Sequence, residues 1–172
     1  MKIVHLLRHA KAHDDRGIND IDRALTERGI RAAVLMGLYM QQCKLLPGAI
    51  LCSNAKRTRQ TWDHLQTHFT PPVAVTIEPR IYMAEASHLI EIIGECPDSV
   101  NEILIIGHNP GLQLLAAEMA KHGDEDLINA VYESFPTATL CSIEFKADHW
   151  SAIAHNHKSG KVSRFIAPVD LV

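Results

Sequence analysis

Two short apolar segments, each followed closely by a histidine, most strongly constrain the fold of this 172-residue chain. Residues 3–7 precede Arg8 and His9, and residues 103–107 precede His108. Short runs of branched apolar residues are typical of buried strands in a parallel sheet. Parallel sheets bind ligands beyond the carboxyl ends of their strands. The sequence therefore predicts that Arg8, His9 and His108 converge in one site.

Strands and helices are predicted to alternate along the rest of the chain. Strands are expected over residues 49–53, 73–77, 102–107, 138–145 and 162–166, and helices from Thr26 and over 56–68, 87–94 and 110–121. Thr26 and Ser87 can cap helix N-termini, and Pro110 suits a first helical turn. This alternation indicates an α/β fold, a three-layer α/β/α sandwich with a mostly parallel central sheet. No linker composition is found, so we expect residues 1–172 to form a single domain.

Charge and cysteine content exclude several classes of function. A net charge of −3 leaves no broad cationic surface for nucleic acid. The apolar start is too short for a secretion signal or a membrane span, so we expect a cytoplasmic protein that does not bind membranes. The four cysteines are dispersed without a CxxC pair, which indicates neither a zinc site nor a disulfide framework. Cys52 is interpreted as a small buried hydrophobe.

The segment after the second predicted strand supplies a third element of the site. Residues 53–61 begin a helix, and the N-H groups and dipole of a helix N-terminus favour an anion. The Arg57 guanidinium matches phosphate oxygens in a bidentate manner, so Arg8 and Arg57 could clamp one phosphoryl group. Three more residues could orient phosphate or substrate: Asn19, Arg23 and Ser53.

Two other sequence features have simpler interpretations. His64 and His68 are four residues apart on a predicted helix, but no HExxH pattern and no third ligand accompany them. We expect a solvated helix face there, and neither a metal nor a cofactor. Residues 159–161 resemble the end of a phosphate loop without its opening glycine, and they are interpreted as a turn between the last two strands.

Four separated motifs contain the candidate residues in a characteristic order. They are residues 6–12 (LLRHAKA), 22–29 (DRALTERG), 53–61 (SNAKRTRQT) and 107–111 (GHNPG). Together they resemble the histidine phosphatase superfamily, and in particular its compact SixA-type phosphohistidine phosphatases. The resemblance spans most of the chain and implies a phosphoglycerate mutase-like fold. Ala10 stands where this superfamily more often has Gly.

The resemblance also implies a covalent mechanism without a metal. His9 is the implied nucleophile, which becomes transiently phosphorylated, while Arg8 and Arg57 bind the phosphoryl group. His108, protonated or at least donating a hydrogen bond, stabilises that group during transfer. A nucleophilic His9 must be neutral, and we expect the two arginines to lower its pKa.

The sequence leaves the general acid open. Many relatives have a Glu after the third strand, where this chain has Met83 followed by Glu85. Glu85 is the best candidate, and the first loop offers Asp15, Asp20 and Asp22 as others. A missing acid favours phosphohistidine, because imidazole leaves more readily than an alkoxide. The expected substrate is a histidine-phosphorylated carrier or phosphotransfer protein.

Three other functions remain as alternatives. A phosphatase of small phosphate monoesters would need a competent acid and a closed, ligand-sized pocket. A phosphomutase would need a more enclosed site than this chain can build. A non-catalytic phosphoprotein-binding module would need Arg8 and Arg57 but not His9. The sequence indicates no particular oligomeric state.

Overall fold

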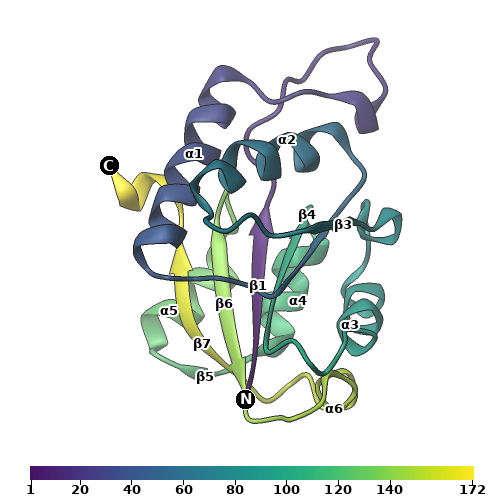
Figure 1. The fold of residues 1–172 in the computed structure, drawn as a ribbon, viewed down its shortest axis with the longest axis vertical. Helices are drawn as coiled ribbons and strands as arrows, with labels where there is room; N and C mark the ends of the chain where they lie inside the picture. The colour runs from purple at the N-terminus through teal and green to yellow at the C-terminus, as the bar shows by residue number, and fades with distance from the viewer.

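One seven-stranded sheet organises the computed structural model, which describes residues 1–172 (Figure 1). The strand order is β3-β2-β4-β1-β6-β7-β5. The strands are β1 Lys2–Arg8, β2 Ala49–Cys52, β3 Val75–Ile77, β4 Glu102–Gly107, β5 Ala120–Gly123, β6 Leu140–Phe145 and β7 Gly160–Ile166. Neighbouring strands pair in parallel except where β6 pairs with β1 and β7. The sheet is therefore mostly parallel, as predicted.

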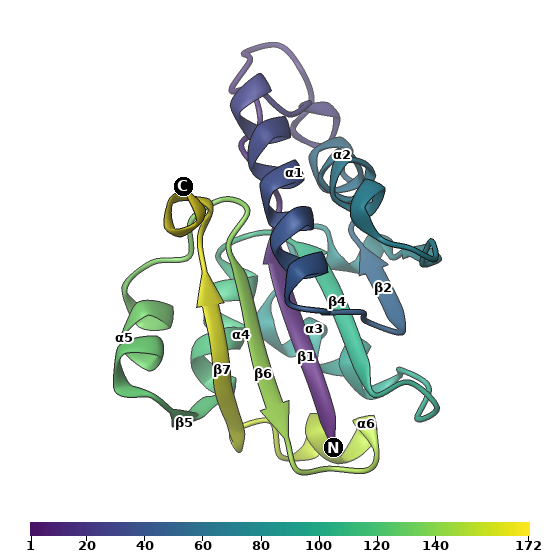
Figure 2. The same cartoon turned by 60° about the vertical axis from the view of Figure 1, so that its left-hand side comes forward.

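Helices cover both faces of the sheet and complete the predicted three layers (Figures 1 and 2). They are α1 Glu27–Gln42, α2 Lys56–Leu65, α3 Ala86–Gly94, α4 Gly111–Met119, α5 Glu125–Glu133 and α6 Trp150–His155. Four short 3-10 helices are η1 Asp20–Asp22, η2 Gln66–His68, η3 Pro79–Ile81 and η4 Pro168–Leu171. One core packs α1 and α2 against one face of the sheet, and a larger core packs α3 to α6 against the other. None of these helices combines the length and apolar composition needed to cross a membrane.

The pairing of β1 with β4 aligns the two histidine motifs. The two strands run parallel with Arg8 opposite Gly107, and the backbone N-H of His9 donates to the Gly107 carbonyl over 3.0 Å. Most residues of both strands are apolar and are buried on both faces of the sheet, which is typical of central parallel strands. His9 and His108 therefore leave adjacent strands at the same edge of the sheet.

The structure confirms several local predictions. The Thr26 hydroxyl caps α1 by accepting from the Gly29 N-H over 3.0 Å. Trp62 and Leu65 of α2 are buried in the core between α1, α2 and the sheet. Cys52 is a buried thiol, and burial raises its pKa to about 12.

Other boundaries differ from the prediction. The sequence interpretation omitted three elements, β5, α5 and α6, because each is short and its pairing or packing depends on distant segments. Helix α4 ends at Met119, since the following residues pair with β7. The segment between β6 and β7 contains α6, so residues 159–161 do not form a tight hairpin turn. Glu85 rather than Ser87 is the N-cap residue of α3.

Close backbone packing connects α4 to the segment before α3. Gly111 begins α4, and a Cβ atom at this position would overlap the Ala84 carbonyl oxygen. Glycine is required here because the two backbones approach too closely for any side chain. The segment that follows His108 is thereby held against the segment that contains Met83.

We predict that Gly111→Ala lowers the free energy of unfolding by about 1 to 3 kcal/mol, because the new methyl group must displace a backbone carbonyl. Urea denaturation measures the effect. Leu114→Ala is the matched control, since Leu114 lies on the same helix and is 54% exposed. Equal stability of the parent and Gly111→Ala proteins would show that this contact relaxes without strain.

Candidate active site

A cavity of about 310 Å³ lies where β1, β2 and β4 end. Backbone segments after these three strands contribute most of its lining. The lining residues are Arg8, His9, Lys11, Ala12, Asp14, Asp20, Arg23, Arg57, Met83, His108, Asn109 and Thr137. The four residues that the sequence placed at the centre of the site, Arg8, His9, Arg57 and His108, are all among them.

His9 is held in one orientation and is neutral. Its side chain is buried, with 7% of the residue exposed, and its Nδ1 lies 2.8 Å from the Ala10 carbonyl oxygen. A carbonyl only accepts hydrogen bonds, so Nδ1 carries the proton and Nε2 keeps its lone pair. Burial, assisted by the charges of Arg57 and Arg8, lowers the pKa of His9 to about 4. The arginines act in the expected direction, but burial is the larger cause.

His108 lies beside His9 and is neutral as well. The two ring centroids are 5.3 Å apart. Arg57 Nη2 can only donate, so it donates to Nδ1 of His108 over 3.2 Å, and the opposite nitrogen donates to Ser53 Oγ over 2.8 Å. Burial lowers the pKa of His108 to about 3. In this structure the His108 N-H is therefore directed at Ser53 rather than into the cavity, so His108 donates a hydrogen bond as a neutral side chain.

The two arginines approach the histidines from different elements. Arg8 ends β1 and donates through Nη1 to the Phe135 carbonyl over 2.8 Å. Arg57 lies in the first turn of α2 and is 2% exposed. The Nε atoms of both arginines are buried without a hydrogen-bond partner. Unpaired buried donors are rare in folded proteins, so each calls for an explanation.

Asp20 neutralises Arg57. Arg57 donates to the Asp20 carbonyl over 2.6 Å and to its carboxylate over 2.9 Å. The same carboxylate accepts from Tyr82 Oη over 2.6 Å and from Arg23 Nε over 2.9 Å. Hydrogen bonds from Tyr82, Arg23 and Arg57 hold the pKa of Asp20 far below its usual range. Asp20 is consequently an ionised acceptor at neutral pH and does not carry a proton to donate.

Five residues considered from the sequence lie outside the cavity lining, and two of them are the acid candidates Asp15 and Asp22. Asn19 is exposed beside Asp20, and its side chain does not cap η1. Ser53 is fully buried and accepts a hydrogen bond from His108, so it orients that ring but does not line the cavity. Glu85 is exposed at the start of α3, and Met83 lines the cavity in its place. The carboxylates that line the cavity are Asp14 and Asp20.

Some contributing residues were missed or underestimated. Thr61 accepts from the Ala10 N-H over 3.0 Å, and Gln60 accepts from the Leu25 N-H over 2.8 Å, so both fasten α2 to the first loop. In the sequence they stand out only as members of the motif at residues 53–61. Tyr82 and Thr137 had no local signal, because they reach the site only through the fold.

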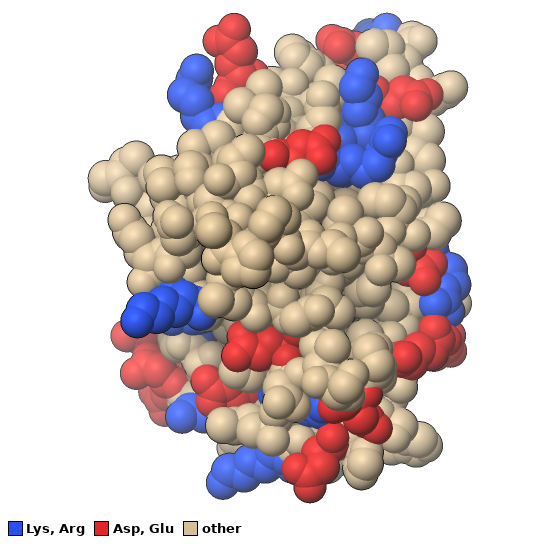
Figure 3. Space-filling model, in the orientation of Figure 1, with Lys and Arg blue, Asp and Glu red and all other residues tan.

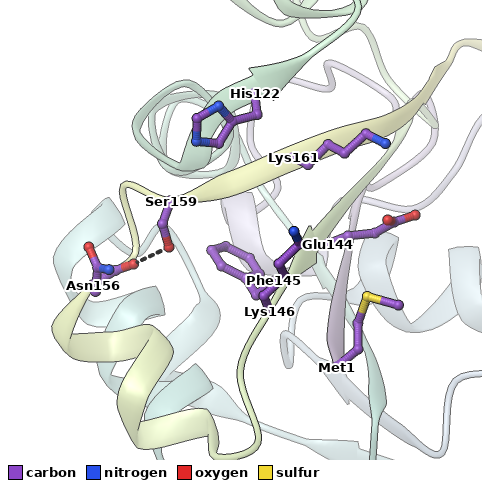
Figure 4. Close-up of a pocket in the computed structure, with 8 residues that line it drawn as sticks. All are labelled: Met1, His122, Glu144, Phe145, Lys146, Asn156, Ser159 and Lys161. Atoms are coloured by element: carbon purple, nitrogen blue, oxygen red, sulfur yellow. Dashed lines mark hydrogen bonds between the residues drawn. The ribbon is translucent and has the colours of Figure 1, made fainter.

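A larger cavity of about 700 Å³ lies at the opposite end of the sheet (Figure 4). It is lined by Met1, His122, Glu144, Phe145, Lys146, Asn156, Ser159 and Lys161. The lining contains a single histidine and no arginine, in contrast to the paired histidines and arginines described above. Elsewhere in the chain, no group of three or more His, Cys, Asp or Glu side chains is placed to hold a metal ion.

Comparisons with known proteins identify the family. The sequence model of the histidine phosphatase superfamily (branch 1) matches residues 4–82. An uncharacterised protein of Mycobacterium tuberculosis is 36% identical over 149 residues, which cover 86% of this chain and 91% of that protein. A protein from Agrobacterium tumefaciens that is described as a candidate phosphohistidine phosphatase SixA has a TM-score of 0.80 at 27% identity, covering 97% of this chain and 99% of that one. Its counterpart from Nakamurella multipartitia has a TM-score of 0.79 at 23% identity, covering 98% and 96%.

The chain therefore belongs to the histidine phosphatase superfamily. The fold is phosphoglycerate mutase-like, as the sequence resemblance implied. These similarities support a phosphatase activity of the histidine-phosphatase type.

We predict that acidification destabilises the protein through His9. An unfolded histidine has a pKa near 6.5, whereas burial lowers the pKa of folded His9 to about 4. Between these values the unfolded state binds the extra proton, so the free energy of unfolding falls as pH is lowered from about 6.5 to about 4. The loss should be smaller in His9→Gln by on the order of 3 kcal/mol. Urea denaturation across this pH range measures it.

The control for this titration is His88→Gln, because His88 is exposed on α3. It should retain the pH dependence of the parent protein. If His9→Gln showed the parent's pH dependence too, His9 would have to be protonated to the same extent in the folded and unfolded states.

We predict that Asp20→Asn strengthens binding of inorganic phosphate by roughly threefold to tenfold, since it removes a negative charge that occupies Arg57. Calorimetric titration with inorganic phosphate at neutral pH measures the affinity. Asp14→Asn is the matched control, because Asp14 lines the same cavity without a hydrogen bond to Arg57. Weaker phosphate binding in Asp20→Asn would mean that Asp20 mainly orients Arg57.

Proposed function

We propose that this protein removes phosphoryl groups from phosphohistidine residues of protein carriers through a covalent intermediate on His9. The observation that carries the proposal is the state of His9. Its imidazole is neutral, its Nδ1 proton is fixed by the Ala10 carbonyl, and its Nε2 lone pair is free beside Arg8 and Arg57. A fixed, neutral imidazole next to an anion-binding pair is what attack on phosphorus requires.

The proposed reaction has two displacement steps at phosphorus. In the first, the Nε2 lone pair of His9 forms a bond to phosphorus, and the electron pair of the substrate P-N bond stays with the leaving imidazole. In the second, water attacks the phosphorus of phosphorylated His9, and the P-N electron pair returns to Nε2. Inorganic phosphate leaves, the water proton passes to phosphate or solvent, and neutral His9 is restored.

Arg8, Arg57 and His108 are the proposed ligands of the phosphoryl group. The partnerless Nε atoms of the two arginines support this role, and so does the Asp20 carboxylate, an anion already held by Arg57. We infer that the phosphoryl group takes over Arg57 donors from Asp20. A dianion beside His108 would favour its protonated form and allow it to donate to phosphoryl oxygen.

The carboxylates of the cavity favour phosphohistidine over ordinary esters. Alkoxide leaving groups need a proton, but the Asp20 carboxylate is held ionised and Glu85 lies outside the cavity. A phosphorylated imidazole that is protonated on its other nitrogen leaves as neutral imidazole without an enzyme acid. Asp14, Asp20 and Met83 at the cavity are exposed, which suits access by a folded carrier protein.

The remaining properties belong to the same proposal. The chemistry of the two steps needs neither a metal nor a cofactor. The reaction would take place in the cytoplasm, where carrier proteins of signalling or sugar-uptake relays are found, and it would involve neither nucleic acid nor membrane. On the face seen in Figure 3, acidic and basic side chains are interspersed, which does not favour nucleic acid.

A phosphatase of small monoesters is the second candidate. A cavity of about 310 Å³ is within the range that holds a small ligand, which is the observation in its favour. This candidate predicts efficient ester hydrolysis and an acid that the cavity lining must supply.

We predict that the parent protein releases phosphate from a histidine-phosphorylated carrier protein in the presence of EDTA, and far faster than from alkyl phosphate monoesters. His9→Ala should abolish release, and His108→Ala should lower it by roughly 100-fold to 1,000-fold, because it removes a transition-state donor. Glu85→Gln is the control and should keep parental turnover. Rapid ester hydrolysis with an inert phosphoprotein would favour the small-molecule phosphatase.

A further inference from the structure

Met83 has an unusual backbone conformation at the mouth of the cavity. Its φ is 50°, in the left-handed region that residues with side chains seldom adopt. It is 53% exposed and lines the cavity together with His9 and His108. Backbone strain of this kind tends to persist where the surrounding structure imposes it, often at functional sites.

Contacts on both sides of Met83 impose this conformation. The Tyr82 hydroxyl donates to the Asp20 carboxylate, and the Tyr82 and His108 rings are perpendicular to each other with their centroids 5.4 Å apart. The Ala84 N-H donates to the Ile81 carbonyl over 3.2 Å, and the Ala84 carbonyl packs against Gly111. The backbone at Met83 is therefore held at the cavity by the contacts of its two neighbours.

Core stability does not explain the methionine. A side chain that is 53% exposed adds little buried apolar surface, and Gly would adopt the same φ without strain. Met83 is also one of only two apolar residues of the lining, and the other, Ala12, is small and 5% exposed. The remaining lining residues are charged or polar.

We propose that Met83 is a specificity-determining residue that receives the leaving imidazole of the substrate, a proposal that rests on the function proposed above. The imidazole is a planar aromatic ring, and thioether sulfur makes favourable contacts with such rings. As His9 bonds to phosphorus, the substrate P-N bond breaks and the ring departs with the electron pair. Met83 contacts the ring through this step and contacts nothing in the second, since the ring has then left.

The test compares two phosphoryl donors that form the same phosphorylated His9. One is a histidine-phosphorylated carrier protein, whose leaving group is an aromatic ring. The other is acetyl phosphate, whose leaving group is non-aromatic and needs no acid. Steady-state kcat and KM are measured for the parent protein, Met83→Gln and Met83→Leu.

Met83→Gln keeps the length of the side chain but makes it polar. It should lower kcat/KM for the carrier protein by up to about tenfold and leave kcat/KM for acetyl phosphate within about twofold of the parent value. Met83→Leu keeps an apolar side chain but has no sulfur, so it should restore only part of the loss. Met83→Gly should raise the melting temperature by relieving the strained φ, while it lowers kcat/KM for the carrier protein as much as Met83→Gln does.

The outcomes separate this proposal from the proposed function. An equal loss with both donors would assign Met83 a structural role, and parental turnover of the carrier protein in Met83→Gln would show that the ring does not bind there. Either result overturns the inference while the phosphohistidine phosphatase stands. A parent protein that hydrolyses acetyl phosphate but not the carrier protein would overturn the proposed function, and the role of Met83 with it.

Discussion

The parallel pairing of β1 with β4 is the constraint on which the site depends. The hydrogen bond from the His9 N-H to the Gly107 carbonyl extends this ladder by one residue beyond β1 and brings the two histidine motifs together. A shift of one residue in this register would turn the side chains of β1 to the opposite faces and separate His9 from His108. Close packing of particular side chains on both faces makes such a shift unfavourable, so the core that stabilises the sheet also sets the geometry of the site.

Burial has a second effect on the same residues. It removes water from His9 and His108 and lowers the pKa of each well below the value in water. The protein thereby maintains two neutral imidazoles beside two guanidinium groups, although Asp14 and Asp20 line the same cavity. Asp20, which is more exposed, supplies the counter-charge to Arg57. The resting site combines buried neutral bases, which do not compete for an anionic group, with an Asp20 carboxylate that an entering anion must displace from Arg57.

The sequence predicted the fold and the centre of the site because these depend on local patterns. Residues 3–7 and 103–107 show the continuous apolar character of central strands, and Arg8, His9, Arg57 and His108 follow directly from strand ends or begin a helix. Prediction was poorer for elements and site residues whose position depends on tertiary contacts. β5 exists only because β7 pairs with it, and Tyr82 reaches His108 across more than twenty positions of sequence. Glu85 was favoured by proximity in sequence, but the left-handed turn at Met83 sends the two side chains to different places.

The contact between Gly111 and the Ala84 carbonyl has a consequence for how such a site can evolve. Helix α4 begins shortly after His108, and Ala84 follows directly after Met83, so one backbone contact joins the segment that contains His108 to the segment at the cavity mouth. The distance between the segment that contains His108 and the segment that contains Met83 is thus set by a backbone contact. Substitutions of exposed side chains can change what the mouth accepts, but they leave that length unaltered. A substrate that needs a different distance between His108 and the cavity mouth would require both backbone segments to change together.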